Sequence, residues 1–118
     1  MARTIDLFID SDQELPELAA RLSELLRSPL SPSPDGARYS LHEAGVTAYL
    51  ARHDFVDDDD LPLNEFRYVL SAVVQGEGRL EESPPATYLR RANRLLRESS
   101  GLASLLVLDL EQPDSAPN

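Results

Sequence analysis

The spacing of apolar residues alternates along this chain between every second residue, typical of strands, and every third or fourth, typical of helices. Residues 4–10 alternate, so one face of a predicted strand carries Ile5, Leu7 and Ile9. A helical spacing follows, carried by Leu15, Leu18, Leu22, Leu25 and Leu26. The chain is therefore expected to begin with a strand and a helix that each have one apolar face.

Four further strands are predicted in the middle and at the end of the chain. Residues 38–42 and 45–53 alternate in polarity on either side of a short polar connection, which predicts a β-hairpin. Residues 66–74 predict a third strand of that meander, and residues 102–110 a final apolar strand.

A second helix is predicted between these last two strands. Ser83 followed by Pro84 is a favourable helix start, because proline at the first position loses no hydrogen bond that the helix would have made. Gly101 is a favourable end. The buried stripe of this helix is expected to consist of Tyr88, Leu89, Ala92, Leu95 and Leu96.

The predicted order is β-α-β-β-β-α-β, in a single α+β domain over residues 1–110. Two helices on one face of a mainly antiparallel sheet are the economical way to bury these apolar faces. The order resembles a ferredoxin-like two-layer sandwich with one additional hairpin strand. Residues 28–36, rich in Pro and Ser, and the acidic residues 54–64 are predicted loops, and residues 111–118 a flexible C-terminal tail.

The charge of the chain restricts its partners. The sequence has 21 acidic residues against 11 basic ones, a formal net charge of -10, which repels nucleic-acid backbones and anionic membranes. Every basic residue is an arginine. The absence of lysine excludes Schiff-base chemistry and the phosphate-binding lysine of P-loops.

Other composition features concern location. There is no cysteine, which excludes disulfides, thiolate zinc sites and cysteine nucleophiles. Asp6 comes too early for the apolar region of a signal peptide, and no apolar run approaches the roughly 20 residues that cross a bilayer. We therefore expect a cytoplasmic protein.

Asp10 and Asp12 follow the first predicted strand as an Asp-x-Asp pair. This spacing resembles the first motif of haloacid-dehalogenase-type phosphatases over residues 7–12, and the resemblance implies a nucleophile at Asp10 and an acid/base at Asp12. Gln13 and Glu14 depart from that family's pattern, and its catalytic lysine has no counterpart here. The stretch from Ser11 to Glu14 also fits a capping box, with acids favourable at a helix N-terminus. We expect the capping role and no catalytic role.

An acidic run in the predicted 54–64 loop is a candidate site for a metal ion or a basic partner. It consists of Asp57, Asp58, Asp59 and Asp60. The spacing fails the calcium-loop pattern from every possible first residue. A solvated acidic loop is one interpretation. The other is that the run binds a basic protein.

The remaining candidates for chemistry are few. His42 and His53 are expected to be surface residues, because two histidines without cysteine would need carboxylates at unrelated positions to hold zinc. We predict no metal site, no cofactor and no catalytic constellation. On the second helix, a positive strip is interpreted as a solvated face, which the first helix's acids could pair, or as an anion or acidic-partner site; it contains Arg90, Arg91, Arg94 and Arg97.

The sheet face away from the helices is the predicted partner-binding surface. If the apolar side of residues 4–10 faces the helices, Asp6 and Phe8 point away from them. By the same alternation, this face should also carry Tyr49, His53, Arg67, Val69, Val73, Leu105 and Val107. Residues 28–36 could cover it, or it could meet another protein, including a second copy.

These observations favour a small acidic, non-enzymatic protein-binding module. Immunity proteins and antitoxins that neutralise basic partners such as nuclease toxins are similar to it in size and charge. On this interpretation the contact residues are Phe8, Tyr49, Arg67, Val69 and the four aspartates 57–60. The alternatives are a ferredoxin-like enzyme or ligand sensor, with a sheet–helix pocket using Arg38, Arg67 or His42, and a homodimeric structural subunit paired through the sheet.

Overall fold

The computed structural model describes residues 3–43, 45–52, 66–74, 79 and 82–108. Its strands are β1 (Arg3–Asp10), β2 (Ser31–Pro32), β3 (Arg38–Glu43), β4 (Val46–Arg52), β5 (Tyr68–Val74) and β6 (Ala103–Leu108). Its helices are α1 (Leu15–Leu26) and α2 (Pro84–Leu95), and α2 continues into a π-helical segment, Leu96–Ser100. The predicted α+β class is confirmed.

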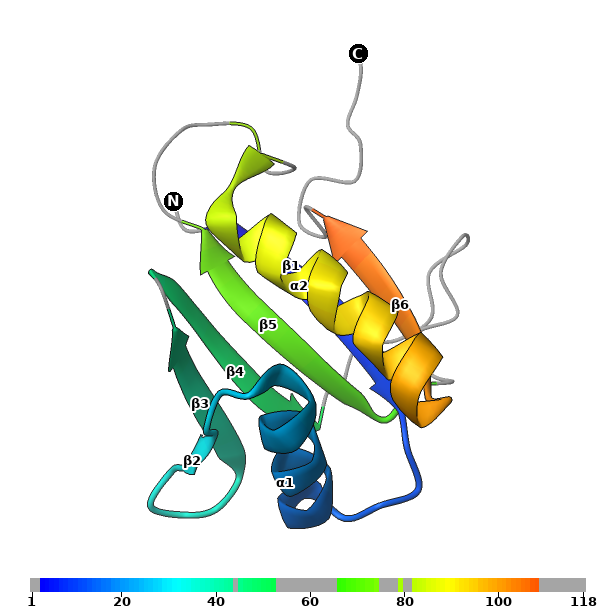
Figure 1. Cartoon of the computed structure of the whole chain (residues 1–118). Coiled ribbons are helices and arrows are strands. Elements are labelled where there is room, and N and C mark those ends of the chain that lie inside the picture. Colours follow the sequence, from blue (N-terminus) through cyan, green and yellow to red (C-terminus); the bar gives the residue numbers. More distant parts are fainter. Residues whose placement is uncertain (1–2, 44, 53–65, 75–78, 80–81, 109–118) are drawn as a thin grey trace.

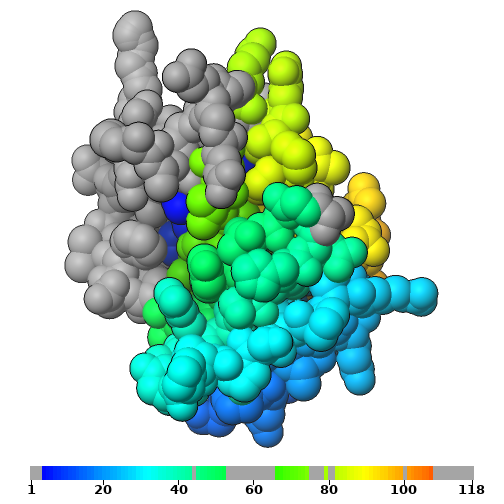
Figure 2. All heavy atoms as spheres, turned by 90° about the vertical axis from the view of Figure 1, so that its left-hand side faces the viewer, coloured from blue at the N-terminus to red at the C-terminus, as the bar shows by residue number. Residues whose placement is uncertain are grey.

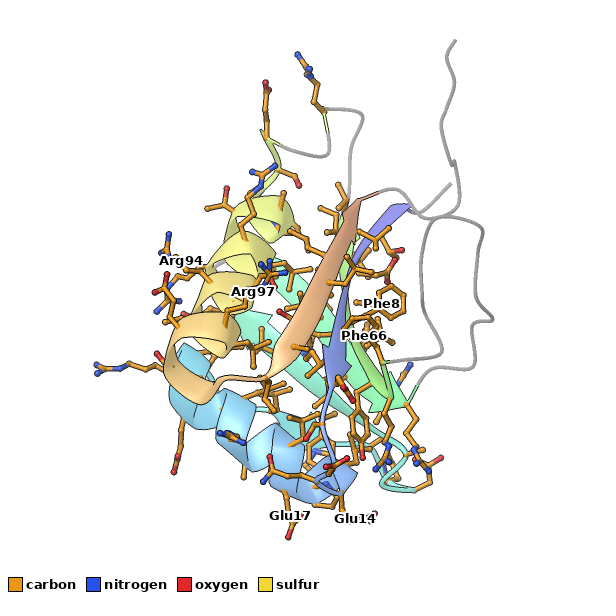
Figure 3. All side chains as sticks on the ribbon, turned by 90° about the vertical axis from the view of Figure 1, so that its right-hand side faces the viewer. Phe8, Glu14, Glu17, Phe66, Arg94 and Arg97 are labelled. Atoms are coloured by element: carbon orange, nitrogen blue, oxygen red, sulfur yellow. The ribbon has the colours of Figure 1, made fainter. Side chains whose placement is uncertain are left out.

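The strands form one antiparallel sheet in the order β2-β3-β4-β5-β1-β6 (Figure 1). Both helices lie on the same side of this sheet (Figures 1 and 3). β1 lies between β5 and β6, so the first strand of the chain is an interior strand. β6, the last one, forms an edge.

The main hydrophobic core lies between the helices and the sheet. The alternating residues of β1 that were predicted to face the helices are fully buried there, and the apolar stripes of both helices pack against them, partly buried at Leu15, Leu25, Tyr88 and Leu95. The core includes Ile5, Leu7, Ile9, Leu18, Leu22, Leu26, Leu41, Leu50, Leu70, Leu89, Ala92 and Leu96.

The loop predicted over residues 28–36 contains the short strand β2, which the sequence did not reveal. Ser31 and Pro32 pair with Ser40 and Tyr39 of β3, and Leu30 packs against the core on the helix side. Figure 2 faces this edge and shows the residues around position 30 (cyan) beside β3 and β4 (green). The segment therefore extends the sheet sideways. The suggestion that it covers the far face of the sheet was wrong.

Helix α1 begins three residues later than the predicted capping box. Glu14 is the N-cap, and its backbone N–H donates to the Glu17 side chain at 3.2 Å, so the box spans Glu14 and Glu17 (Figure 3). Pro16 lies in the first turn, where its missing N–H costs no helical bond. Ser11 instead accepts a hydrogen bond from the Gln13 N–H at 3.1 Å and closes a tight turn.

Helix α2 begins and ends where the sequence predicts. The Ser83 hydroxyl accepts a hydrogen bond from the Ala86 N–H at 3.3 Å, and Pro84 is the first helical residue. At the other end Gly101 has a φ of 72°, in the left-handed region that favours glycine, and Leu102 N–H bonds back to the Leu96 carbonyl at 3.3 Å. This end of the helix leads directly into β6.

The predicted acidic loop (54–64), His53 and the predicted tail (111–118) lie outside the described residues. Of the predicted final strand, the structure describes Ala103–Leu108 as β6. In the part of the chain that the structure describes, no helix has the length and apolar character needed to span a membrane.

Candidate functional site

The centre of the sheet face away from the helices is apolar and buried. Phe8 of β1 and Val69 of β5 are cross-strand neighbours, and their exposed fractions are 0% and 7%. Phe66, Leu105 and Val107 pack against them. Figure 3 shows Phe8 and Phe66 on the side of the sheet opposite the helices, where alternation predicted Phe8. Neither Phe8 nor Val69 presents its side chain to solvent in this conformation.

A buried carboxylate adjoins this apolar centre. Asp6 is 3% exposed, and its two oxygens accept hydrogen bonds from the Ser71 hydroxyl at 2.5 Å and the Thr4 hydroxyl at 3.3 Å. Ser71 is the cross-strand partner of Asp6 on β5. A carboxylate is buried in an apolar surrounding only where donors satisfy it, so these hydroxyls fix the position of Asp6. Alternation placed Asp6 on this face, but its burial was not anticipated.

The part of the same face near β3 is more exposed and carries an aromatic–cation contact. The Arg38 guanidinium lies 4.6 Å from the centre of the Tyr49 ring, a distance at which the ring face attracts a cation. Tyr49 is half-buried and Arg38 is exposed. Tyr49 is the neighbour of Ser71 on β5 and of Ser40 on β3, so one cross-strand row runs from the exposed edge to Asp6.

His42 lies on this face as well and contacts a hydroxyl. Its Nδ1 is 3.3 Å from the Thr47 hydroxyl on β4, directly across the hairpin. His42 is exposed, as predicted for a surface histidine. Within the described residues, no three or more His, Asp or Glu side chains come together in a way that could hold a metal ion.

The predicted contact residues are thus only partly brought together. Phe8 and Val69 are neighbours, Tyr49 lies two strands from Phe8 on β4, and Arg67 is exposed just before β5. The four aspartates at 57–60 lie outside the described residues. Partner binding by this set stays a prediction.

Asp10 is the last residue of β1 and Asp12 lies in the turn that leads to α1, and both are exposed. Hydrogen bonds to Gln13 hold this turn in place. The Tyr68 hydroxyl donates to the Gln13 carbonyl at 2.7 Å, and Arg21 donates to the Gln13 side chain at 3.2 Å. The turn therefore ties the start of α1 to β5.

The arginines of α2 and of the π-helical segment that continues it are arranged around a surface hollow beside β6. The hollow has a volume of about 340 Å³ and is lined by Arg90, Asn93, Arg94, Arg97 and Glu98. Residues 90, 94 and 97 share one side of a helix because their spacings are four and three residues. Arg91 lies about 100° from Arg90 around the helix and does not line the hollow.

Hydrogen bonds connect the hollow to β6. One Arg97 Nη donates to the Ser104 backbone carbonyl at 3.1 Å, and the Ser104 hydroxyl donates to the Asn93 side-chain oxygen. Among the described residues, no acid of α1 forms an ion pair with Arg91, Arg94 or Arg97, so the suggested pairing with the first helix is not found there. Of the strip, Arg97 contacts the last strand.

A second hollow of about 210 Å³ lies at the opposite end of α2. It is lined by Gly45, Thr47, Val73, Val74, Ser83, Pro84 and Pro85. The Ser83 hydroxyl is already engaged as the helix cap. The lining offers few polar groups to fix a ligand.

Comparison with known proteins adds no assignment: the chain matches no protein-family model, no curated protein and no solved structure.

Proposed function

We propose that this chain is a small, non-enzymatic protein-binding module of the inhibitor or immunity type, acting in the cytoplasm. It neutralises a basic partner, such as a nuclease toxin, which it binds through the acidic segment between β4 and β5.

The observation that carries this function is the separation of charge along the chain. Residues 53–65 and 109–118 contain nine of the 21 acids and none of the 11 arginines. The other 95 residues contain twelve acids and eleven arginines, so they are nearly neutral. Almost the whole net charge of -10 therefore belongs to two segments, and a field concentrated in this way steers a basic partner toward them.

The attachment of the first acidic segment suits recognition. Residues 53–65 connect β4 and β5, which are paired in the sheet as far as Arg52 and Tyr68. Both ends of the segment are thus held by an interior pair of strands. Binding segments held by a rigid scaffold lose less conformational freedom on association than segments attached at one end.

The pocket-based alternative receives less support from the described residues. An enzyme or sensor using Arg38 or His42 needs these side chains between the sheet and the helices. Both lie on the opposite face, where Arg38 contacts Tyr49 and His42 contacts Thr47. This placement favours a binding module.

We also propose that the fold is a ferredoxin-like two-layer sandwich extended at one edge. The support is the chain order β1-α1-β4-β5-α2-β6 and the sheet order β4-β5-β1-β6, in which each helix connects two strands that flank a third. β2 and β3 are then an addition beside β4.

The test is to neutralise the acidic run by changing Asp57, Asp58, Asp59 and Asp60 to asparagine. A matched control neutralises four exposed acids of the scaffold, with Asp10→Asn, Asp12→Asn, Glu24→Gln and Glu43→Gln. Both variants change the net charge equally, so only the location of the charge differs.

Basic partners are captured from the native host with the wild-type chain, and association and dissociation rates are then measured for all three proteins. We expect the 57–60 variant to associate at least about tenfold more slowly, with little change in dissociation, because charges at the rim of an interface act mainly by steering. The difference should shrink as salt shortens the Debye length. Equal slowing in the control, or capture of no basic protein, would contradict the function.

A further inference from the structure

The strand β6 is an edge of the sheet that the described residues form, although Ser104 within it is buried. Within the described residues β6 pairs only with β1. Figure 3 looks onto this edge and shows no described ribbon in front of β6. An edge strand turns the N–H and C=O of alternate residues toward its partner and those of the intervening residues toward the open side.

The contact of Arg97 identifies which residues of β6 turn their backbone N–H and C=O groups toward the open side of the sheet. Arg97 donates to the Ser104 carbonyl at 3.1 Å, so this carbonyl is directed away from the ladder with β1. By alternation, the backbone groups of Leu106 are also on the open side. Protein edges of this kind are often blocked by a charged side chain. Here the blocking group is a cation that a competing ligand can bind.

The hollow beside this edge is positively charged. Three arginines and one acid, Glu98, contribute its ionisable groups. Arg94 is exposed and has no hydrogen-bond or ion-pair partner in the described part of the chain. Figure 3 shows Arg97 between α2 and β6, with Arg94 farther out on the helix. Guanidinium groups bind carboxylates with paired, charge-assisted hydrogen bonds.

We propose that the open edge of β6 and the adjacent arginine hollow together bind an extended acidic peptide. The peptide adds a strand to the sheet by pairing with Ser104 and Leu106, and its acidic side chains on the helix side contact Arg94 and Arg97. Main-chain hydrogen bonds supply the general affinity and the arginines select for acids.

An acidic segment of another protein fits this edge better than a second copy of β6 does. Antiparallel pairing of two β6 edges would place both α2 helices on the same side of a continuous sheet. The arginine hollows of the two copies would then meet, and like charges in contact oppose association. The same arginines attract a strand that carries carboxylates. The residues of this surface are not those of the acidic segment of the proposed function, so either proposal can fail without the other.

The test uses a capped synthetic peptide of about eight residues with alternating glutamate and valine. A second peptide replaces every glutamate with glutamine and keeps the pattern and length. Binding is measured by titration of ¹⁵N-labelled protein, and hydrogen exchange of the β6 amides is recorded with and without peptide. The variant Arg94→Gln removes one cation of the hollow, and Arg91→Gln removes the same charge from the same helix outside the hollow.

We expect the glutamate peptide to bind, to slow exchange at Ser104 and Leu106, and to lose at least about tenfold in affinity with Arg94→Gln but not with Arg91→Gln. The glutamine peptide should bind at least about tenfold more weakly. Equal affinity for the two peptides, or equal effects of the two variants, would overturn the selection for acids. Binding of the peptide without protection of the β6 amides would contradict the added strand. Protection of the same amides by inorganic phosphate alone would contradict it as well.

Discussion

Replacing Ser71 by alanine should destabilise the fold because it removes a close donor to a buried carboxylate. The Ser71 hydroxyl lies 2.5 Å from an oxygen of Asp6, which is 3% exposed. A hydrogen bond to a charged group contributes about 1.5–3 kcal/mol, and the buried carboxylate keeps its desolvation cost when this donor is lost. The Thr4 hydroxyl, at 3.3 Å, remains as a weaker partner. We therefore expect a loss of about 2 kcal/mol in the free energy of unfolding.

The assay is urea unfolding followed by far-ultraviolet circular dichroism, since the chain has no tryptophan. A loss of about 2 kcal/mol corresponds to a melting temperature lower by roughly 8 °C for a domain of this size. Ser40→Ala is the matched control, because Ser40 lies on the same face and donates at 3.5 Å to a neutral backbone carbonyl of Ser31. It should cost less than about 0.5 kcal/mol.

A double-mutant cycle with Asp6→Ala tests whether the loss belongs to this pair. The coupling free energy between positions 6 and 71 should be about 1–2 kcal/mol. A coupling near zero, or equal losses for Ser71→Ala and Ser40→Ala, would refute the argument that the hydroxyl supports a buried charge.

Three further predictions concern the helices. Gly101→Ala should lower the free energy of unfolding by about 1 kcal/mol, because residue 101 has a φ of 72°, which residues with a side chain rarely adopt. The added Cβ itself would meet no atom within 4 Å. An unchanged urea midpoint would contradict this prediction. Burial raises the pKa of the Tyr88 phenol above its usual 10.0, so the stability that depends on the neutral phenol is present below pH 10 and is lost as the pH rises through the folded-state pKa. Urea midpoints from pH 9 to 11.5 should therefore fall more for the wild type than for Tyr88→Phe, and parallel curves would contradict this. Asp12→Asn should change the unfolding free energy by less than about 0.5 kcal/mol, since Asp12 is exposed and precedes the N-cap; a phosphatase activity abolished by Asp10→Asn would overturn the non-catalytic assignment.

The pattern of apolar residues predicted which face of the sheet each strand residue occupies. Phe8, Val69 and Leu105 were assigned to one face from alternation alone, and they lie in contact there. The burial of Phe8 could not be predicted in this way. Alternation gives the direction of a side chain, whereas its exposure depends on what else packs over that face.

The start of α1 shows a limit of local motifs. Ser11 and Glu14 have the spacing of a capping box, and so do Glu14 and Glu17. The second pair forms the cap, and Ser11 closes the preceding turn. Two overlapping motifs cannot be ranked from sequence when the choice also depends on how the turn packs, here through the bond from Tyr68 to the Gln13 carbonyl.

The sequence by itself determined the order and approximate bounds of the elements other than β2, the apolar faces of β1 and the two helices, and the separation of charge between the scaffold and two acidic segments. These are properties of residues close together in the chain, where periodicity and helix-capping preferences act. Tertiary structure alone decided that β1 is an interior strand, that β6 is an edge beside the arginines of α2, and that Asp6 meets Ser71, which is 65 residues away. Strand pairing joins distant residues through backbone groups that every residue carries, so the sequence of one strand does not specify its neighbour.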